Sequence, residues 1–458
     1  MKIRYLYSTI LVLLLSAGIF SCSKKLDLKP QQNIDAATAI QTTDDLESAM
    51  IGCYSTLGNG ALYGTNLNLL PELLANADYC TWRGTFTSFR QITNKTMTRE
   101  NAEASRTWIR GYSAINSANT VLENLNIITN AAQKSKLEGE ALWVRAIMHF
   151  ELVRLYALPY DASLANNTQL GIPIVTKSTK NETDAFLKPA RNTVSEVYAA
   201  VITDLTNAVT KLPVANGNRA SKAVASGFLA KVYLQKGDFV NARSASNSAV
   251  ANYKMNAAVL AAFTNKNTNE SLFEVQQNDQ NNAGTSNDGL ATFYASLPGI
   301  GRADVRITAS FLNSYPQNDL RRSEWYYVGT GARPGNNYCG KWQSFSQNIP
   351  VLRLSEILLI RAESNLRLGT SVGATPEVDL ASVRNPVRTN LPSIVAPTLA
   401  NILAERSLEL AFEGFKIHEL RRLKLSTGSL AYNDKILVFP IPQREIDANS
   451  SLTQNPGY

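Results

Sequence analysis

The stretch Ala225–Val250 (ASGFLAKVYLQKGDFVNARSASNSAV) constrains the fold more than any other part of the chain. One helical pattern ends in the turn KGDF, which contains Gly237 and Asp238, and a second pattern begins at once. Small and aromatic residues flank this turn close to where tetratricopeptide repeats have them. Small side chains let two antiparallel helices approach, and because one pair cannot bury its apolar face alone, such pairs stack. The pattern therefore predicts a right-handed array of helix pairs.

Helical periodicity also marks most of the remaining chain. The patterns cover Thr43–Leu57, Ser105–Ile128, Lys136–Tyr156, Thr193–Leu212, Val351–Leu368 and Leu399–Phe415. Periodicity is lost near residues 57–98 and 276–350, where polar and glycine-rich sequence is mixed with aromatic residues. The predicted fold class is mostly α: tetratricopeptide-like helix pairs form a right-handed scaffold, and long irregular loops carry the binding face.

The N-terminal sequence reads as an export signal. Lys2 and Arg4 precede the apolar run Leu6–Phe20, which is too short to span a membrane comfortably. The residues Ile-Phe-Ser come directly before Cys22, as in a bacterial lipobox, the motif in which a cysteine thiol is lipidated. We expect residues 1–21 to be removed and Cys22 to carry acyl chains, which anchor a protein without spanning the bilayer. The alternative is a plain signal peptide with an incidental cysteine.

Net charge limits the partners that fit this chain, and the cysteine count limits its disulfides. The formal net charge is +8, and +6 once Lys2 and Arg4 are removed, with no dense basic block, so nucleic acid is a poor partner. Three further cysteines allow at most one disulfide: Cys53, Cys80 and Cys339. Cys53 falls in a helical pattern. The other two fall in loop-like sequence, and their spacing leaves open whether they pair.

No catalytic motif is readable in the sequence. The two histidines, His149 and His418, each fall in a helical pattern, and neither a metal-ligand spacing nor a Walker motif occurs. Carboxylates alternate with arginines on the predicted helices: Glu356, Glu363, Glu405, Glu409 and Glu413 with Arg353, Arg361, Arg406, Arg421 and Arg422. A glycosidase would use two such carboxylates, but ion pairs between packed helices explain them better. We expect no enzyme, no metal and no cofactor.

Two C-terminal motifs are specific. Ala404–Arg422 reads AERSLELAFEGFKIHELRR, and Phe439–Tyr458 reads FPIPQREIDANSSLTQNPGY. They resemble the ERRLELAFEGHRWFDLRR helix and the PIPQxEI…QNPGY tail of the SusD/RagB nutrient-binding lipoproteins of Bacteroidetes. Further motifs resemble the family's in the same order along the chain: Thr43–Leu57, Ala141–Tyr156, Ala220–Phe239, the set Asp319, Arg321 and Lys341, and Ile349–Glu363.

The resemblance implies one SusD-like helical domain over residues 36–458, tethered through residues 22–35 to lipid on Cys22. Such a protein binds glycan without catalysis at the exterior of the outer membrane and passes it to a SusC-like, TonB-dependent transporter. Peptide cargo, as in the RagB branch, stays open. Two other hypotheses are an all-α glycosidase and a repeat scaffold that only contacts proteins. The glycosidase is disfavoured because no catalytic set of residues is readable in the sequence. The repeat scaffold is disfavoured by the long aromatic loops.

Glycan binding needs flat aromatic faces for sugar rings and polar side chains for hydroxyl groups. Trp82 leads the candidates because it lies in the polar aromatic loop DYCTWRGTF, where members of the family often carry a binding tryptophan. For each aromatic candidate the alternative is packing within the fold, and we expect at least one of Trp325, Tyr326 and Tyr327 to be buried. The predicted ligand residues are Trp82, Arg83, Tyr79, Tyr294, Asn278 and Trp325.

Overall fold

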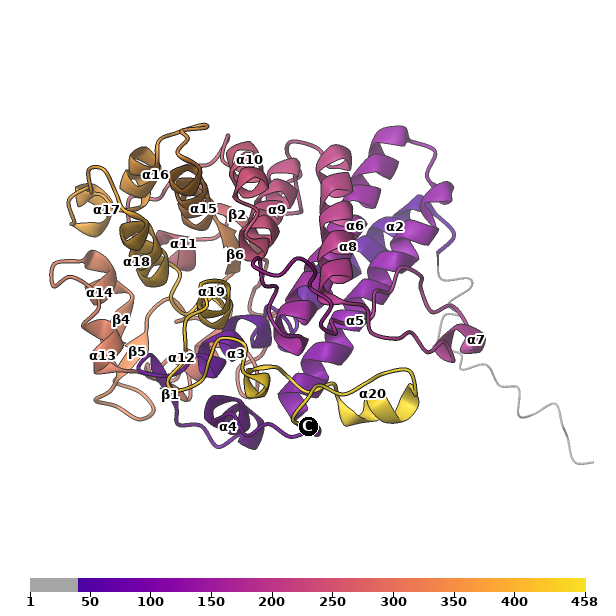
Figure 1. The fold of residues 1–458 in the computed structure, drawn as a ribbon, viewed down its shortest axis with the longest axis horizontal. Coiled ribbons are helices and arrows are strands. Elements are labelled where there is room, and N and C mark those ends of the chain that lie inside the picture. The colour runs from indigo at the N-terminus through magenta and orange to yellow at the C-terminus, as the bar shows by residue number, and fades with distance from the viewer. Residues whose placement is uncertain (1–39) are drawn as a thin grey trace, which may run out of the picture. The chain divides into compact units, whose positions relative to one another are not determined.

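Long helices that pack side by side form the scaffold at one end of the molecule (Figure 1). The computed structural model describes residues 40–458, of which Thr42–Tyr458 form one compact unit. The predicted signal and tether, residues 1–35, lie outside the described residues. The first helices are α2 (Thr43–Leu57), α5 (Ala102–Glu123), α6 (Ala131–Tyr156) and α8 (Val194–Lys211), with the short η2 (Leu125–Ile127) between α5 and α6.

Capping side chains set where these helices begin. The Thr42 hydroxyl accepts a hydrogen bond from the Asp45 N–H, and the Asp45 carboxylate accepts one from the Thr42 N–H. Thr193 and Glu196 form the same reciprocal pair before α8. Because these signals are local, the helix predicted over Thr43–Leu57 is confirmed with its bounds unchanged.

The helix pair predicted from the KGDF turn is present. α9 (Lys222–Lys236) ends at Gly237, whose φ of +78° favours glycine. Asp238 then caps α10 (Phe239–Ala249) by accepting from the Asn241 N–H at 3.1 Å. The mostly helical, tetratricopeptide-like fold class is confirmed. Further helices continue the stack: α15 (Leu354–Leu368), α16 (Pro376–Val383), α17 (Pro386–Thr389), α18 (Leu399–Glu409) and α19 (Lys416–Arg422).

Two small antiparallel sheets lie among the helices. The larger has the strand order β1–β3–β5–β4, formed by β1 (Cys80–Trp82), β3 (Val305–Ile307), β5 (Asn337–Cys339) and β4 (Tyr326–Val328). The smaller pairs β2 (Ser271–Val275) with β6 (Ile349–Arg353). In the larger sheet, Trp82 lies opposite Val305. The sheet therefore joins two segments that are far apart in the sequence.

The zones predicted as irregular hold more regular structure than expected. Residues 57–98 contain α3 (Asn66–Leu74) and α4 (Thr87–Asn94), and every residue of α3 is buried. The loop prediction was wrong there because α3 has only nine residues, contains Pro71 in its interior and lacks a side-chain cap, so the usual sequence signals of a helix are weak. Residues 276–350 contain β3, β4 and β5 with three short helices: α12 (Leu290–Tyr294), α13 (Ala309–Leu312) and α14 (Leu320–Glu324). The other short elements are α7 (Glu182–Ala185), α11 (Ala261–Thr264), η3 (Lys435–Leu437) and α20 (Gln443–Ala448).

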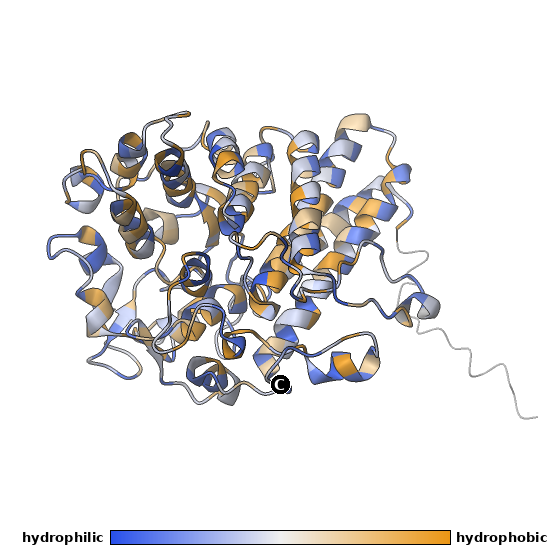
Figure 2. Cartoon of the chain, viewed as in Figure 1, coloured by the Kyte–Doolittle hydropathy of each residue, from blue (hydrophilic) through white to orange (hydrophobic). Residues whose placement is uncertain are grey.

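Hydrophobic residues gather on the faces that the helices turn toward one another (Figure 2). Trp143 of α6 is fully buried, with its ring centroid 4.7 Å from that of Phe273. The thiols of Cys53, Cys80 and Cys339 are all free and buried, so Cys80 and Cys339 are not joined in the structure. Over residues 40–458, no helix combines the length and apolar character needed to cross a membrane.

Candidate functional site

One surface of the larger sheet gathers polar groups around an aromatic ring, and we call it the strand-end surface. It forms where β1 ends, β3 begins and α4 begins; the labels of β1 and α4 lie toward the lower edge of Figure 1. The Arg83 N–H donates to the Asp304 carbonyl at 2.6 Å, which extends the pairing of β1 with β3 beyond Trp82. The strand-end surface consists of Arg83, Thr85, Phe86, Arg302, Asp304 and Arg333.

A layer of aromatic rings supports the strand-end surface on its inner side. The Trp82 ring centroid lies 4.8 Å from that of Phe89 and 5.6 Å from that of Phe293. The Phe86 ring lies 6.1 Å from both phenylalanines. Gly84 lets the chain cross the indole closely, because a Cβ there would lie 2.3 Å from Trp82 Cζ2. Trp82 is only 8% exposed, so the half-buried Phe86 is the ring of this layer that reaches solvent.

One guanidinium group lies over this ring, and a second is tied to the first through Asp304. The Arg302 guanidinium carbon lies 4.6 Å from the Phe86 ring centroid, a cation–π distance. Arg302 donates to Thr85 Oγ1 at 3.1 Å and to Asp304 Oδ2 at 2.9 Å. Arg333 donates to the other oxygen of Asp304 at 2.7 Å. Because the buried Asp304 carboxylate orients both arginines, the surface presents fixed donors next to an aromatic face.

Arg83 and Asn278 are the two predicted ligand residues with exposed side chains. Within residues 40–458, the Arg83 guanidinium has no hydrogen-bond or ion-pair partner. Asn278 lies in the polar loop before α12, where its Oδ1 accepts from the N–H groups of Gln280 at 2.9 Å and Asn281 at 2.8 Å. In the described part of the chain no hydrogen bond joins Asn278 to the strand-end surface. The structure therefore brings Arg83 and Trp82 together but leaves Asn278 apart.

Tyr79 and Tyr294 pack on Phe412 instead of facing solvent. Their ring centroids lie 4.4 Å and 5.8 Å from that of Phe412. The Tyr79 hydroxyl accepts from the Phe412 N–H at 2.8 Å. Burial raises the pKa of both phenols well above the usual range. Neither ring has a free face for a sugar in this structure, because neighbouring side chains cover it.

Trp325 is fully buried, in line with the expectation of burial among the three consecutive aromatics. Its Nε1 donates to the Val259 carbonyl at 3.0 Å, and Lys341 Nζ lies 3.8 Å from the centre of its ring. Lys341 in turn pairs with Glu413 at 2.6 Å. These contacts cover the indole and make Trp325 part of the core packing.

The carboxylates and arginines that alternate in the sequence form a buried ion network. Arg321 pairs with Glu405 and Glu409, and Arg353 and Arg388 also pair with Glu409. Burial alone would raise the pKa of Glu409, but the three guanidinium groups outweigh it and hold that pKa well below its usual range. Ion pairing, which the sequence favoured over catalysis, is confirmed for the five glutamates and for Arg353, Arg361, Arg406 and Arg422. Arg421 differs, because among the described residues it has no ion pair and donates to the carbonyls of Arg154 and Leu437.

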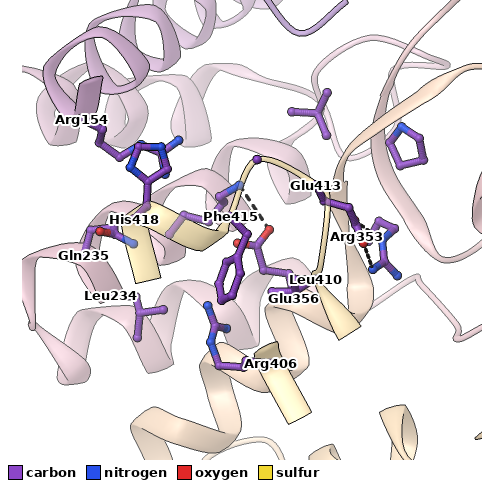
Figure 3. Close-up of a pocket in the computed structure, with 14 residues that line it drawn as sticks. Arg154, Leu234, Gln235, Arg353, Glu356, Arg406, Leu410, Glu413, Phe415 and His418 are labelled. Carbon is purple, nitrogen blue, oxygen red and sulfur yellow. Dashed lines mark hydrogen bonds and ion pairs between the residues drawn. The ribbon is translucent and has the colours of Figure 1, made fainter. Parts of the chain in front are cut away.

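A small cavity borders the buried ion network (Figure 3). It measures about 30 Å³, which is room for about two water molecules and not for a sugar. On its wall, Glu356 pairs with Lys231 at 3.2 Å and Glu413 with Arg353 at 2.7 Å. Burial and nearby cations hold the pKa of His418 well below its usual value, so this histidine is neutral. The cavity therefore belongs to the packing of the core.

A larger groove, of about 760 Å³, lies between α5, the segment 173–189 and α20. Trp108 and Tyr112 contribute aromatic surface to it, and the Tyr112 hydroxyl donates to the Pro173 carbonyl at 2.8 Å. An oligosaccharide would fit the groove by size. None of the predicted ligand residues lines it. Over the described residues, no group of three side chains suited to holding a metal ion occurs.

Sequence reasoning missed three contributors to the strand-end surface: Phe86 as the solvent-facing ring, and Arg302 and Arg333 as its guanidinium neighbours. Phe86 stands four residues after Trp82 in the same aromatic loop, which was a usable signal. Arg302 and Arg333 come from segments more than two hundred residues away, and their sequence context carries no signal. The pairing of β1 with β3 brings Arg302 there, and the pairing of β3 with β5 brings Arg333.

The fold defines a helical-repeat protein, and the segments between its helices carry the strand-end surface. Residues 25–234 match the family model described as "Starch-binding associating with outer membrane", and residues 324–437 match the model described as "SusD family". The chain belongs to the SusD/RagB family of carbohydrate-binding proteins associated with the outer membrane.

Similar proteins agree with this assignment. SusD-like protein P2 of Formosa agariphila is 26% identical and covers 98% of this chain and 99% of its own length. A SusD superfamily protein of Bacteroides thetaiotaomicron has the same fold, with a TM-score of 0.80 and 24% identity over 91% of this chain and 100% of that one. A laminarin-binding SusD-like protein also shares the fold, with a TM-score of 0.75 and 21% identity over 92% of this chain and 100% of that one.

Proposed function

We propose that this chain is a lipid-anchored, non-catalytic protein that binds an oligosaccharide at the cell surface and delivers it to a SusC-like, TonB-dependent transporter. Membership of a carbohydrate-binding family supports the choice of ligand class. A structural neighbour that binds laminarin supports it further. Delivery to a transporter and the outward orientation are what the family resemblance implies.

The strand-end surface is the observation that carries the proposal. Sugar rings have one relatively apolar face and an edge of hydroxyl groups, so their binding sites combine an aromatic face with fixed polar groups. Phe86 supplies the face, and Arg83, Arg302 and Thr85 supply donors and an acceptor within reach of it. We propose Arg83 and Phe86 as direct ligand contacts, with Trp82 supporting Phe86 through Phe89.

The remaining predicted ligand residues have different places in the proposal. Asn278 is exposed and stays a proposed polar contact at the edge of a long ligand. Tyr79, Tyr294 and Trp325 are covered by other residues, so a ligand would reach them only if the core opened. We therefore assign these three to support of the fold.

Cys22 lies outside the described residues, and its lipidation stays a prediction. An acyl anchor at the start of the mature chain would keep the binding domain next to a transporter in the same membrane. That geometry raises the local concentration of ligand at the transporter, as a tether does for any pair of linked sites.

The proposal is tested by retention of the purified protein in gels that contain one polysaccharide or one peptide mixture each. We expect at least one polysaccharide to retard the wild type. Phe86→Ala should weaken that retention about tenfold, because the exposed aromatic face is lost.

Phe239→Ala is the matched control. Phe239 is also half-buried and also lies 4.6 Å from a guanidinium carbon, that of Arg367, but it belongs to the helical scaffold. It should leave retention unchanged. Retention by peptides alone would favour peptide cargo, and equal loss in both variants would remove the strand-end surface from the proposal.

A further inference from the structure

The strand-end surface is surrounded by more guanidinium groups than the contacts of Phe86 require. Arg90 of α4 donates to the Thr85 carbonyl at 3.0 Å, which brings its charge to the same loop. Arg306 of β3 lies opposite Thr81 of β1, and Arg83 comes two residues after Thr81, just past the end of β1, where its N–H still pairs with Asp304. Alternation along the strand puts Thr81 and Arg83 on the same face. Diagonal neighbours of this kind lie roughly 7–8 Å apart. Five arginines therefore share one end of the sheet: Arg83, Arg90, Arg302, Arg306 and Arg333.

Negative charge at this end of the sheet falls far short of balancing them. Every ion pair of these five arginines within residues 40–458 ends on one carboxylate, that of Asp304. The side chains of Arg302 and Arg333 stay 34% and 37% exposed although they are paired. Arg83, Arg90 and Arg306 are exposed and have no ion pair in the described part of the chain. The group keeps a net charge of +4.

The start of α4 adds to the positive potential. Phe86 precedes this helix and offers no side-chain acceptor to its first N–H groups. Such groups carry partial positive charge and bind anions readily. The first N–H groups of α4 follow Phe86 directly in the chain, and the Arg302 guanidinium lies over the Phe86 ring.

The buried ion network shows how the charge of an arginine is balanced where the arginine serves packing of the core. Arg353 there pairs with Glu270, Glu409 and Glu413, so its charge is fully compensated. The arginines around Phe86 lack this compensation, and keeping like charges together costs stability. An unbalanced cluster next to an aromatic face fits a ligand that brings the missing negative charge.

We propose that the strand-end surface binds an anionic polysaccharide, one whose sugars carry carboxylate or sulfate groups. The inference rests on the proposed glycan-binding function and names its substrate class. Guanidinium groups match both anions because their planar donors form paired, charge-assisted hydrogen bonds. Phe86 takes the apolar face of a sugar ring, and Arg83 and Arg306 take the anionic groups along the chain of sugars.

The test compares two exposed arginines of the cluster with one elsewhere. The variants are the double substitution Arg83→Gln with Arg306→Gln, and Arg110→Gln on α5, which is also exposed and unpaired among the described residues. The probes are alginate and polygalacturonate for carboxylate, carrageenan for sulfate, and laminarin and amylopectin as neutral polymers. The dissociation constant of the purified full chain is measured for each probe.

We expect an anionic probe to bind the wild type, and the double variant to bind it at least about tenfold more weakly. Arg110→Gln should change the constant by less than about twofold. Binding should weaken as NaCl is raised to about 0.5 M, because salt screens exposed charges. Comparing the dissociation constants for alginate and polygalacturonate with the constant for carrageenan shows whether carboxylate or sulfate is the recognised group.

Other outcomes separate the inference from the function on which it rests. Binding of a neutral polymer alone, unchanged in the double variant, would overturn the anionic substrate class and leave glycan binding intact. Equal losses for the double variant and Arg110→Gln would mean non-specific attraction and would also overturn it. No binding to any polysaccharide would overturn both the inference and the proposed function.

Discussion

At the scale of single residues, arginine has two uses in this chain, and its neighbours decide between them. Arg353 is 1% exposed and lies among three glutamates, where it joins helices of the core. Arg83 is exposed and unpaired within the described residues, next to an aromatic ring layer. A buried guanidinium must be paired because its desolvation is costly, whereas an exposed one is solvated by water and stays available to a ligand.

Glu419 makes the cost of an unpaired buried charge measurable. Burial would raise the pKa of its carboxyl, but Arg406 and Arg422 outweigh burial and lower it from its usual 4.5 to about 2. At pH 7, Glu419→Gln should destabilise the fold by about 3 kcal/mol, because two buried guanidinium groups lose part of their charge balance. The free energy of unfolding from urea titrations measures this.

The pH dependence of that difference follows from the sign of the shift. A carboxylate with a depressed pKa in the folded state stabilises the fold above its unfolded pKa, and the contribution is lost as pH falls through the folded value. The gap between wild type and Glu419→Gln should therefore be constant above about pH 5 and shrink between about 4.5 and 2. Glu138→Gln, which breaks a half-exposed pair with Lys211, should cost less than about 1 kcal/mol. A Glu419 variant as stable as this control would contradict the argument.

At the scale of elements, the turn between α9 and α10 shows how backbone conformation and packing act together. Gly237 has a φ of +78°, a region that side chains disfavour, and Asp238 caps the following helix. The turn also packs against the loop after α6, since a Cβ on Gly237 would lie 2.8 Å from the Cβ of Ala162. The position therefore has two reasons to be glycine.

Gly369 separates these two reasons, because it ends α15 with a φ of +63° and has open space around its Cα. Gly369→Ala should cost about 1 kcal/mol from backbone strain alone. Gly237→Ala should cost about 1 kcal/mol more, since Ala162 must also move. Thermal unfolding of the two variants measures the difference in stability. Equal losses of stability would show that the close approach of Ala162 does not matter at Gly237.

At the scale of the whole molecule, the compact unit begins at Thr42, and the predicted lipid site Cys22 lies twenty residues before it in the sequence. In the proposed function, lipid on Cys22 connects this unit to the outer membrane. We expect Cys22→Ser to move the protein from the membrane fraction to the soluble fraction and to abolish labelling with a radioactive fatty acid.

Cys53→Ala is the control for that experiment. Burial raises the pKa of the Cys53 thiol to about 12, so this thiol is inert and its loss should leave the protein in the membrane fraction. A Cys22→Ser protein that still pellets with membranes and is still labelled would contradict the lipid anchor.

Prediction from the sequence succeeded where the signal is local or periodic. The helix over Thr43–Leu57 and the turn at Gly237 carry caps and spacing that need no distant partner. The helix Asn66–Leu74 was missed because it has only nine residues, contains Pro71 in its interior and lacks a side-chain cap. The assignment of Trp82 to a loop was wrong, because Trp82 ends β1 and pairs with Val305 of β3. Its burial against Phe293 likewise depends on a segment about two hundred residues away.

The sequence by itself determined that this chain is a stack of helix pairs, because caps, turns and apolar spacing depend on neighbouring residues. The likeness to the SusD/RagB family came from motifs such as Ala404–Arg422 and Phe439–Tyr458. Only the tertiary structure decided which groups meet at the strand-end surface. The pairing of β1 with β3 brings Arg302 and Asp304 to Phe86, and the same folding covers Tyr294 and Trp325. Contacts across such sequence distances depend on packing of the whole domain, and no local pattern encodes them.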